Sequence, residues 1–398
     1  MKFEWQTKKI GDVVDIRRGS SPRPIHKFLA TEGMPWVKIA DATSDTSRYI
    51  WKTNEFIIED GVTKSVKVAP ETLIVSNSAT PGLPKIMKTT ACVHDGWLVF
   101  SNYRGITRDF LYYKFIDIRR TLVNQANGSV FQNLKTDIVK DFDIRIPCIE
   151  TQKKIVGILS QIDEKIELNN SINNNLEQQA QAIFKSWFVD FDPFGGNRPI
   201  DWITGIVDDL GAEIICGKTP STKKKEYYGG NTPFITIPDM HGCVYNVSTE
   251  RYLSAAGVAS QPKKTLPHNT VCISCIGTAG LVTLVSEKSQ SNQQINSIIP
   301  KEGISAYYIY LLMQTLSETI NKLGQSGSTI VNLNKTQFGK IPVTIPSEQV
   351  LCNFDTLCKP LFEMILSNQK ENIKLANLRD TLLPKLMSGE LDVSDIDL

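Results

Sequence analysis

The sequence predicts an α+β protein made of two similar globular units and two long helices that pair as an antiparallel coiled coil with pseudo-twofold symmetry. Three observations support this prediction. Two long segments place apolar residues at heptad spacing, which is typical of coiled-coil helices. These segments correspond at an offset of 199 residues, as Asn169 and Asn368 show, and the regions before them correspond at an offset of 198, as Gly19 and Gly217 show. Short strands mixed with a few helices are typical of the α+β class.

The first long helix is expected between residues 150 and 191. No Pro or Gly interrupts residues 158–192, so a helix here can extend for about 40 residues and roughly 60 Å. Such a helix cannot bury its apolar stripe alone and requires a partner. Its heptad positions are apolar except for two central Asn residues: Ile155, Leu159, Ile162, Ile166, Asn169, Asn173, Leu176, Ala180, Ile183 and Trp187.

The C-terminal segment supplies this partner. A polar residue at a heptad position lowers stability but fixes the alignment of two helices. Matching Asn pairs therefore favour paired helices over two independent surface helices. The second set keeps the character of the first except at Arg379, which replaces Ala180: Phe354, Cys358, Leu361, Ile365, Asn368, Asn372, Leu375, Arg379, Leu382 and Leu386.

Antiparallel pairing of the helices would place Asn169 near Asn372 and Asn173 near Asn368. Parallel pairing would also align the Asn residues, but it would put both globular units at one end. The short Gly-rich linker after Phe194 favours the antiparallel form. We predict four segments, namely a first globular unit, a first helix, a second globular unit, and a second helix with a tail: residues 1–147, 148–192, 193–346 and 347–398.

The two globular units repeat one plan of short strands and loops. In the first unit we expect strands at residues 35–39, 72–76, 97–100 and 142–146, with a helix at 110–121. The second unit repeats characteristic residues at the same spacing, including Pro233 for Pro35, Asp239 for Asp41, Thr270 for Thr72, Ser274 for Ser76 and Gly280 for Gly82. Each copy is a whole domain, so this is a duplication and not a solenoid.

The overall composition describes an ordinary globular protein. The chain has 398 residues, with 41% hydrophobic and 22% charged residues and a net charge of +2. We find no apolar run long enough to cross a membrane and no signal-peptide core, so we expect a cytoplasmic protein with no membrane contact. Disulfides are not expected there. Cys272 and Cys275 form a C-x-x-C inside an apolar run, which favours buried strand cysteines over a zinc site.

No catalytic constellation is visible in the sequence. It contains no phosphate-binding G-x-x-x-x-G-K-[ST] loop and no G-x-G-x-x-G after a strand. The four His residues, at positions 26, 94, 241 and 268, are dispersed and lack metal-ligand spacing. We therefore expect no catalytic residue, no metal ligand and no cofactor in this chain.

Polar and partly basic loops stand at equivalent positions in both halves. Basic side chains can neutralise phosphate, and hydroxyl, amide and guanidinium groups can contact base edges. The residues that we predict to bind DNA are Arg17, Ser20, Arg23, Ser76, Asn77, Thr80, Lys85, Lys218, Ser221, Lys223, Lys224, Tyr227, Thr278 and Gln293. The run Lys223 to Lys225 alone would be interpreted as a solvated loop. The functional interpretation is favoured because both halves place polar, partly basic loops at equivalent positions.

The whole chain resembles the DNA-specificity subunit of type I restriction-modification enzymes. Residues 182–194 and 378–390 are similar to that family's helix-end signatures, and residues 146–152 and 345–349 to its helix-start pattern, although Thr151 interrupts the usual acidic-Gln pair. Asn292-Gln293 matches a common element of the family's target recognition domains, where the first half has His94-Asp95. The two halves are therefore expected to recognise different bases.

The resemblance implies a non-catalytic subunit that binds double-stranded DNA. Each globular unit would be a target recognition domain for one half of a split site, and the helices would set the gap between the half-sites. Two methyltransferase subunits would bind the chain and supply S-adenosylmethionine chemistry, and motor-nuclease subunits would add ATP and Mg²⁺. Two alternatives remain: an enzyme with a degenerate duplicated domain, which would bind S-adenosylmethionine or metal itself, and a coiled-coil scaffold that binds protein only.

Overall fold

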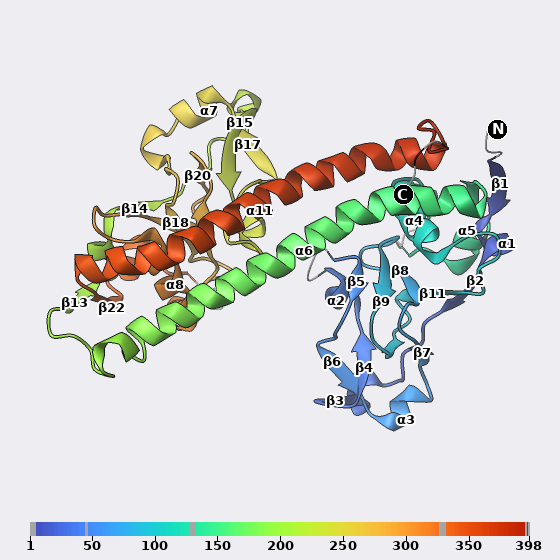
Figure 1. Ribbon diagram of the computed structural model, residues 1–398, viewed down its shortest axis with the longest axis horizontal. Helices are drawn as coiled ribbons and strands as arrows, with labels where there is room; N and C mark the ends of the chain where they lie inside the picture. The colour runs from blue at the N-terminus through green and yellow to red at the C-terminus, as the bar shows by residue number, and fades with distance from the viewer. Residues whose placement is uncertain (1–4, 44–46, 127–132, 326–331, 395, 397–398) are drawn as a thin grey trace. The chain divides into compact units, whose positions relative to one another are not determined.

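The computed structural model describes residues 5–43, 47–126, 133–325, 332–394 and 396 (Figure 1). The chain divides into two compact units. The first comprises Met1–Glu167 and Leu375–Leu398, and the second comprises Leu168–Lys374. The division passes through both long helices, so each unit contains a globular part together with a portion of each helix.

The globular part of the first unit contains two five-stranded sheets and a two-stranded sheet within its described residues. The central sheet has the order β2-β11-β8-β9-β5, with bounds Asp15–Arg18, Trp97–Ser101, Leu73–Ser76, Pro84–Met87 and Tyr49–Ile50. The second has the order β3-β6-β4-β10-β7, with bounds Leu29–Ala30, Glu55–Ile57, Met34–Val37, Ala91–Val93 and Val66–Val68. Strand β1 (Gln6–Lys9) pairs with β12 (Asp143–Ile146) beside the start of the long helix.

Helices complete the first globular part. The α-helices are α1, α2, α3, α4 and α5, with bounds Ile10–Val13, Ile39–Thr43, Glu59–Val62, Arg108–Ala126 and Thr136–Lys140. Helix α4 contributes Phe110, Leu111 and Phe115 to a fully buried core. The strands predicted at 35–39, 72–76, 97–100 and 142–146 correspond to β4, β8, β11 and β12, and the predicted helix at 110–121 lies inside α4.

The globular part of the second unit repeats the central sheet of the first, but its second sheet is smaller. Its central sheet has the order β14-β21-β18-β19-β16, with bounds Gly211–Cys216, Ile295–Pro300, Val271–Ser274, Val282–Val285 and Tyr245–Asn246. A three-stranded sheet has the order β17-β15-β20, with bounds Arg251–Leu253, Tyr228–Ile235 and Gln290–Ser291. Strand β13 (Ile203–Ile206) pairs with β22 (Pro342–Ile345). The α-helices are α7, α8, α9 and α10, with bounds Ala255–Ala259, Ala306–Thr315, Ser317–Gly324 and Lys335–Gly339.

The two long helices are α6 (Ile149–Phe188) and α11 (Glu348–Ser388), drawn in green and red in Figure 1. In the second unit Asn169 pairs with Asn372 and Asn173 pairs with Asn368, so residue numbers run in opposite directions along the two helices. In the first unit Arg379 pairs with Asp163 in the same sense. The helices are therefore antiparallel, and the parallel alternative is excluded.

Each helix also buries side chains against a globular part. Ile155 and Leu159 of α6 share the first unit's core with Leu383 and Leu386 of α11. In the second unit Ala180 and Phe184 of α6 share a core with Phe354 and Cys358 of α11, among others. The predicted heptad positions Ile183 and Leu382 are only half-buried, whereas their neighbours Phe184 and Leu383 are buried. The buried face rotates there because each helix contacts the sheets as well as its partner helix.

Candidate nucleic-acid interface

Equivalent glycines start the polar loops of both units. The amide of Gly19 donates to the carbonyl of Trp97 at 2.8 Å, and that of Gly217 donates to the carbonyl of Ile295 at 3.0 Å. A Cβ added to Gly19 would lie 2.1 Å from His94 O, and one added to Gly217 would lie 2.1 Å from Asn292 O. Only glycine permits this close approach of two backbones.

The glycines bring three segments together in each unit. In the first unit Asn77 N donates to Gly96 O at 2.8 Å, which joins the loop between β8 and β9 to residues 94–96. In the second unit Cys275 N donates to Gln294 O at 2.8 Å in the same way. Each unit therefore brings together three segments. They are the loop after β2 or β14, the loop between β8 and β9 or between β18 and β19, and the short turn before β11 or β21. We call these three segments the loop cluster of each unit.

Asp95 is the centre of the loop cluster of the first unit. Its carboxylate accepts from Ser21 Oγ at 2.6 Å and pairs with Arg23 Nη2 at 3.1 Å. Arg18 Nε donates to its backbone carbonyl at 2.7 Å. Burial opposes the ionisation of this carboxylate, but the hydrogen bond from Ser21 and the two guanidinium charges outweigh it, and the pKa of Asp95 is lowered. Asp95 therefore holds two exposed arginines at the surface of the cluster.

His94 lies behind this charged surface. Its ring centroid is 6.1 Å from that of Trp36 and 6.4 Å from that of Trp97, and both tryptophans are buried. Burial lowers the pKa of His94, because the charged imidazolium would lose its hydration. His94 is therefore a neutral ring at neutral pH that supports the turn.

Four of the residues predicted to bind DNA lie at the end of β8, on the loop between β8 and β9, or in β9, and three of them are buried. Ser76 accepts from Leu83 N at 3.0 Å, and Asn77 Nδ2 donates to Asp95 O at 3.0 Å. Lys85 donates to Ser47 O and is 4% exposed. Ser76, Asn77 and Lys85 therefore shape the loop from inside, and their contact with DNA stays a prediction. Thr80 is half-buried on the same loop.

Arg17 lies in β2, and Ser20 and Arg23 lie on the loop that follows it. These residues are accessible to different degrees. Arg17 and Arg23 are exposed, and Ser20 is half-buried. Arg17 Nη2 donates to Lys67 O at 3.2 Å, and Ser20 Oγ donates to Lys64 O at 3.1 Å. These bonds tie the loop to the neighbouring sheet and leave the arginines at its surface.

The loop cluster of the second unit presents different side chains. Gln293 is exposed, and its Oε1 accepts from Thr219 Oγ1 at 2.7 Å. Thr278 is exposed on the equivalent inner loop. An amide and hydroxyls thus stand where the first unit has a carboxylate and arginines.

The basic run of the second unit follows on the same loop. Lys218, Ser221, Lys223 and Lys224 are exposed. Lys224 Nζ lies 3.1 Å from the hydroxyl of Tyr227 and 5.0 Å from the centre of its ring. Tyr228 donates to Pro220 O at 2.8 Å, which closes the base of the loop. The lysine run is therefore exposed to solvent on a loop whose base is held by the hydrogen bond from Tyr228.

The cysteine pair of the second unit is internal. Cys272 lies in β18, Cys275 follows it, and both are buried. Burial raises the pKa of each thiol to about 12, so both are neutral at pH 7. In the part of the chain that the structure describes, no group of three or more His, Cys, Asp or Glu is arranged to hold a metal ion.

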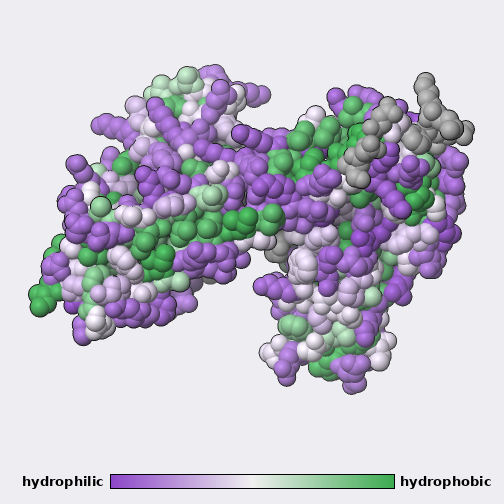
Figure 2. Space-filling view, in the orientation of Figure 1, coloured by the Kyte–Doolittle hydropathy of each residue, from purple (hydrophilic) through white to green (hydrophobic). Residues whose placement is uncertain are grey.

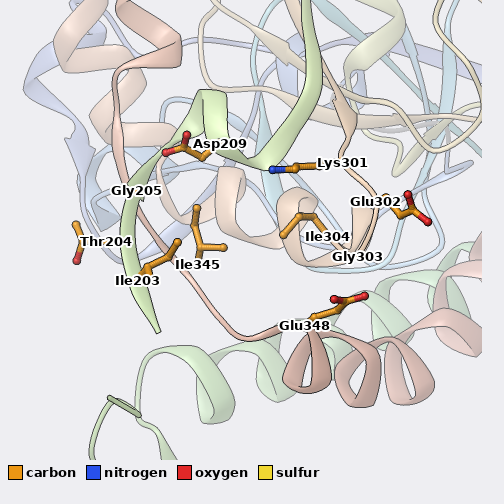
Figure 3. A pocket seen from close by; sticks show the side chains of 10 residues that line it. All are labelled: Ile203, Thr204, Gly205, Asp209, Lys301, Glu302, Gly303, Ile304, Ile345 and Glu348. Carbon is orange, nitrogen blue, oxygen red and sulfur yellow. The ribbon is translucent and has the colours of Figure 1, made fainter. Parts of the chain in front are cut away.

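A shallow hollow of about 370 Å³ in the second unit has the opposite character to the loop cluster. It lies between β13, the start of α11 and the segment before α8, and Figure 3 shows its polar side chains. Its charged residues are Asp209, Glu302 and Glu348, with Lys301 as the cation. Such a surface repels a polyanion, so it is not part of the candidate interface.

The four Asn residues predicted to align the helices form a hydrogen-bonded ladder in the second unit. Asn169 Nδ2 donates to Asn372 Oδ1 at 2.9 Å, and Asn368 Nδ2 donates to Asn173 Oδ1 at 2.9 Å. Asn169 is fully buried and Asn368 is 8% exposed. Because sliding one helix would leave these amides unpaired in an apolar seam, the ladder opposes any other alignment.

A buried ionic network in the first unit was not predicted from the sequence. Tyr113 donates to Asp163 Oδ2 at 2.7 Å, and Arg379 Nη1 donates to Asp163 Oδ1 at 2.8 Å. Arg48 Nη2 donates to Glu164 Oε1 at 3.1 Å, and Arg48 Nε lies 3.4 Å from Glu167 Oε1. The network joins α4, α6 and α11 to the residue before β5. Arg379, the exception in the heptad pattern, is therefore the partner of a buried aspartate.

These features define a class of protein: a duplicated protein in which each α+β unit carries a polar loop cluster and packs on a pair of antiparallel helices. The family described as type I restriction modification DNA specificity domain matches residues 2–178 and again residues 199–353. The chain belongs to this family. In the part that the structure describes, no helix is long and apolar enough to span a membrane.

Known relatives agree with this assignment. The type I restriction enzyme HindI specificity subunit of Haemophilus influenzae is 35% identical, with 73% of this chain and 79% of the relative covered. The MjaIX specificity subunit of Methanocaldococcus jannaschii is 26% identical, with 99% of this chain and 95% of the relative covered. The crystal structure of the S subunit of the type I restriction-modification system from M. genitalium has a TM-score of 0.60 at 16% identity, with 97% of this chain and 96% of that chain covered. It shares the fold.

Proposed function

We propose that this chain is the DNA-recognition subunit of a type I restriction-modification complex and that each globular part recognises one half of a bipartite site. One observation supports this most strongly. The two loop clusters have the same backbone frame, fixed by Gly19 and Gly217, but present different chemistry. Arginines fixed by Asp95 suit guanine edges and phosphates, whereas Gln293 suits adenine. Two different half-sites follow from this difference.

The chain contributes recognition and no catalytic step. The relatives named above are specificity subunits, and membership in their family confirms the expected non-catalytic role. We propose that S-adenosylmethionine, ATP and Mg²⁺ bind to partner subunits and that this chain holds no cofactor. We further propose that the complex acts in the cytoplasm.

The long helices are the proposed docking surface for two methyltransferase subunits, through which the motor-nuclease subunits join. Leu357 and Met364 are 47% and 51% exposed on α11. They are seven residues apart and so share one face of the helix. Figure 2 shows apolar side chains at the surface along part of α11. Exposed apolar residues in a row on a helix suit a protein partner.

The proposal is tested by expressing the chain with methyltransferase subunits in cells that lack DNA methylation and then sequencing the methylated bases. We expect one methylated motif made of two short specific sequences separated by a nonspecific gap. Methylation at a single contiguous sequence, or sequence-independent methylation, would contradict the proposal. Failure of the isolated chain to bind S-adenosylmethionine in a titration is the matched control against the enzyme alternative.

A further inference from the structure

A hollow of about 390 Å³ opens in the first unit between α4 and the loop that joins β8 to β9. Among the residues that the structure describes, its lining contains three cationic side chains and no carboxylate. Four hydroxyl side chains lie beside them. The polar lining residues are Thr43, Ser47, Thr80, Lys85, Tyr112, Arg119 and Arg379.

The three cations differ in how their charge is balanced. Arg379 pairs with Asp163 and Asp380, each at 2.8 Å. Lys85 donates to Ser47 O. Arg119 forms no ion pair with a described carboxylate, and its Nε donates to the neutral carbonyl of Pro81 at 3.0 Å. A guanidinium has five N–H donors, and the bond to Pro81 uses one of them.

The surroundings of Arg119 penalise its charge. The side chain is half-buried, and loss of hydration lowers the pKa of Arg119. A partly buried cation that no described carboxylate balances costs free energy, which an arriving anion recovers. Planar guanidinium groups match the geometry of phosphate oxygens, and neighbouring hydroxyls can donate to the same group.

The second unit shows that the fold does not require this arginine. Gly82 and Gly280 both have positive φ, +75° and +87°, and form the same turn. The residue that faces Gly82 is Arg119, and the residue that faces Gly280 is Ser317. Ser317 Oγ donates to Gly280 O at 2.9 Å. A serine therefore satisfies the turn, and Thr283 stands at the position of Lys85.

We propose that the hollow around Arg119 is a phosphate-binding site present in the first unit and absent from the second. This inference rests on the proposed DNA-recognition function. Thr80 belongs to the loop cluster, so a DNA backbone phosphate of the first half-site is the ligand that reaches the hollow. Such a contact orients the DNA without specifying a base. It compensates in the first unit for the lysine run that only the second unit has.

The test compares Arg119→Ser, which installs the residue of the second unit, with Arg120→Ser. Arg120 is the exposed neighbour on α4, so its replacement removes the same charge outside the hollow. The measurement is the affinity of the assembled methyltransferase complex for its own DNA site at several salt concentrations. Removal of one phosphate-binding cation reduces the log-log slope by about 0.9. Over a fourfold rise in salt, the wild type should lose about 3.5 times more affinity than Arg119→Ser.

Two further arms identify the ligand and protect the test from misfolding. Arg119→Lys keeps the positive charge but not the planar guanidinium group, so the variant should keep most of the salt dependence of DNA binding. Inorganic phosphate added to the complex without DNA distinguishes free phosphate from DNA: selective thermal stabilisation of the wild type over Arg119→Ser, with equal DNA slopes, would assign the site to free phosphate.

The inference is overturned if Arg119→Ser changes neither the DNA slope nor the response to phosphate, or if Arg120→Ser changes the slope equally. Its failure is distinguishable from failure of the proposed function. If only the phosphate-site inference fails, the wild-type complex still binds its specific DNA site. If the proposed function fails, the wild-type complex shows no sequence-dependent DNA binding at all.

Discussion

The two globular parts share a central sheet and its polar loops, and they differ in their second sheets and in the side chains that the loops present. Their central sheets have the same strand order, and Gly19 and Gly217 approach the facing strand to the same distance. On this frame the first unit places arginines around Asp95, and the second places Gln293 beside Thr219. The comparison teaches that the frame is set by backbone contacts that tolerate no change, whereas recognition chemistry is carried by side chains that can change freely.

The comparison predicts its largest effect for exchange of a whole unit. Replacing residues 1–147 with the recognition domain of another family member should change one half-site completely and leave the other unchanged, because each loop cluster is built within its own unit. Mapping the methylated motif of the hybrid gives the result. The reciprocal exchange of residues 193–346 is the control, and a change in both half-sites after one exchange would refute two independent units.

A smaller but still large effect is expected at the glycines. Gly19→Ala places a methyl group 2.1 Å from His94 O, and Gly217→Ala places one 2.1 Å from Asn292 O. Overpacking of this kind costs about 1–3 kcal/mol or more. Each change should weaken recognition of its own half-site, as measured by binding to DNA with one half-site altered. Thr31→Ala removes a hydroxyl from an exposed residue outside the predicted DNA-binding set and is the control; equal effects of Thr31→Ala and Gly19→Ala would contradict the close-approach argument.

The lysine run should have a moderate effect that depends on salt. Replacing Lys223, Lys224 and Lys225 with Ala should weaken DNA binding and reduce its log-log salt slope by about 0.9 for each DNA phosphate that a lysine neutralises. Binding measured across a salt series tests this expectation. Lys301→Ala is the control, because Lys301 lies beside the carboxylates of the acidic hollow. An unchanged slope in the triple variant would make the run a solvated loop.

The smallest effect concerns pH and only one unit. Burial lowers the folded-state pKa of His94 below the ordinary value of 6.5. Between the folded-state pKa and about pH 6.5, the unfolded chain therefore binds more protons than the folded chain. The free energy of unfolding is unaffected by His94 above about pH 6.5 and decreases as the pH drops toward the folded-state pKa. Thermal unfolding of His94→Asn, which carries the residue of the second unit, should lack this loss. An identical pH dependence in wild type and variant would show that His94 does not contribute.

Much of the fold can be predicted from the sequence because its helices and strands are specified by local patterns of apolar and polar residues. The helices α6 and α11 appear as heptads, and the Asn pairs at equivalent positions predict how they align. The strands β8 and β11 appear as short apolar runs. The duplication is visible because Gly19 and Gly217, or Pro35 and Pro233, keep their spacing.

The parts that the sequence did not predict depend on contacts between distant residues. Ser76, Asn77 and Lys85 are polar and lie near turns, so they resemble surface residues, but the loop folds back and buries them. Arg379 interrupts the apolar heptad pattern of its helix, and its partner Asp163 is 216 residues away in the sequence. Arg119 sits in a helical pattern without any local signal of the hollow that it lines.

We propose that two separate recognition units contact DNA at a distance set by the paired helices. The most direct test inserts four residues near Asn173 together with a matched insertion near Asn372, which keeps the seam in phase. Four residues add about 6 Å of rise and about 40° beyond one turn, and base pairs rise about 3.4 Å. The methylated motif of this variant should contain the same two half-sites with the gap longer by one or two base pairs. An active complex that keeps both half-sites and the original gap would contradict the account.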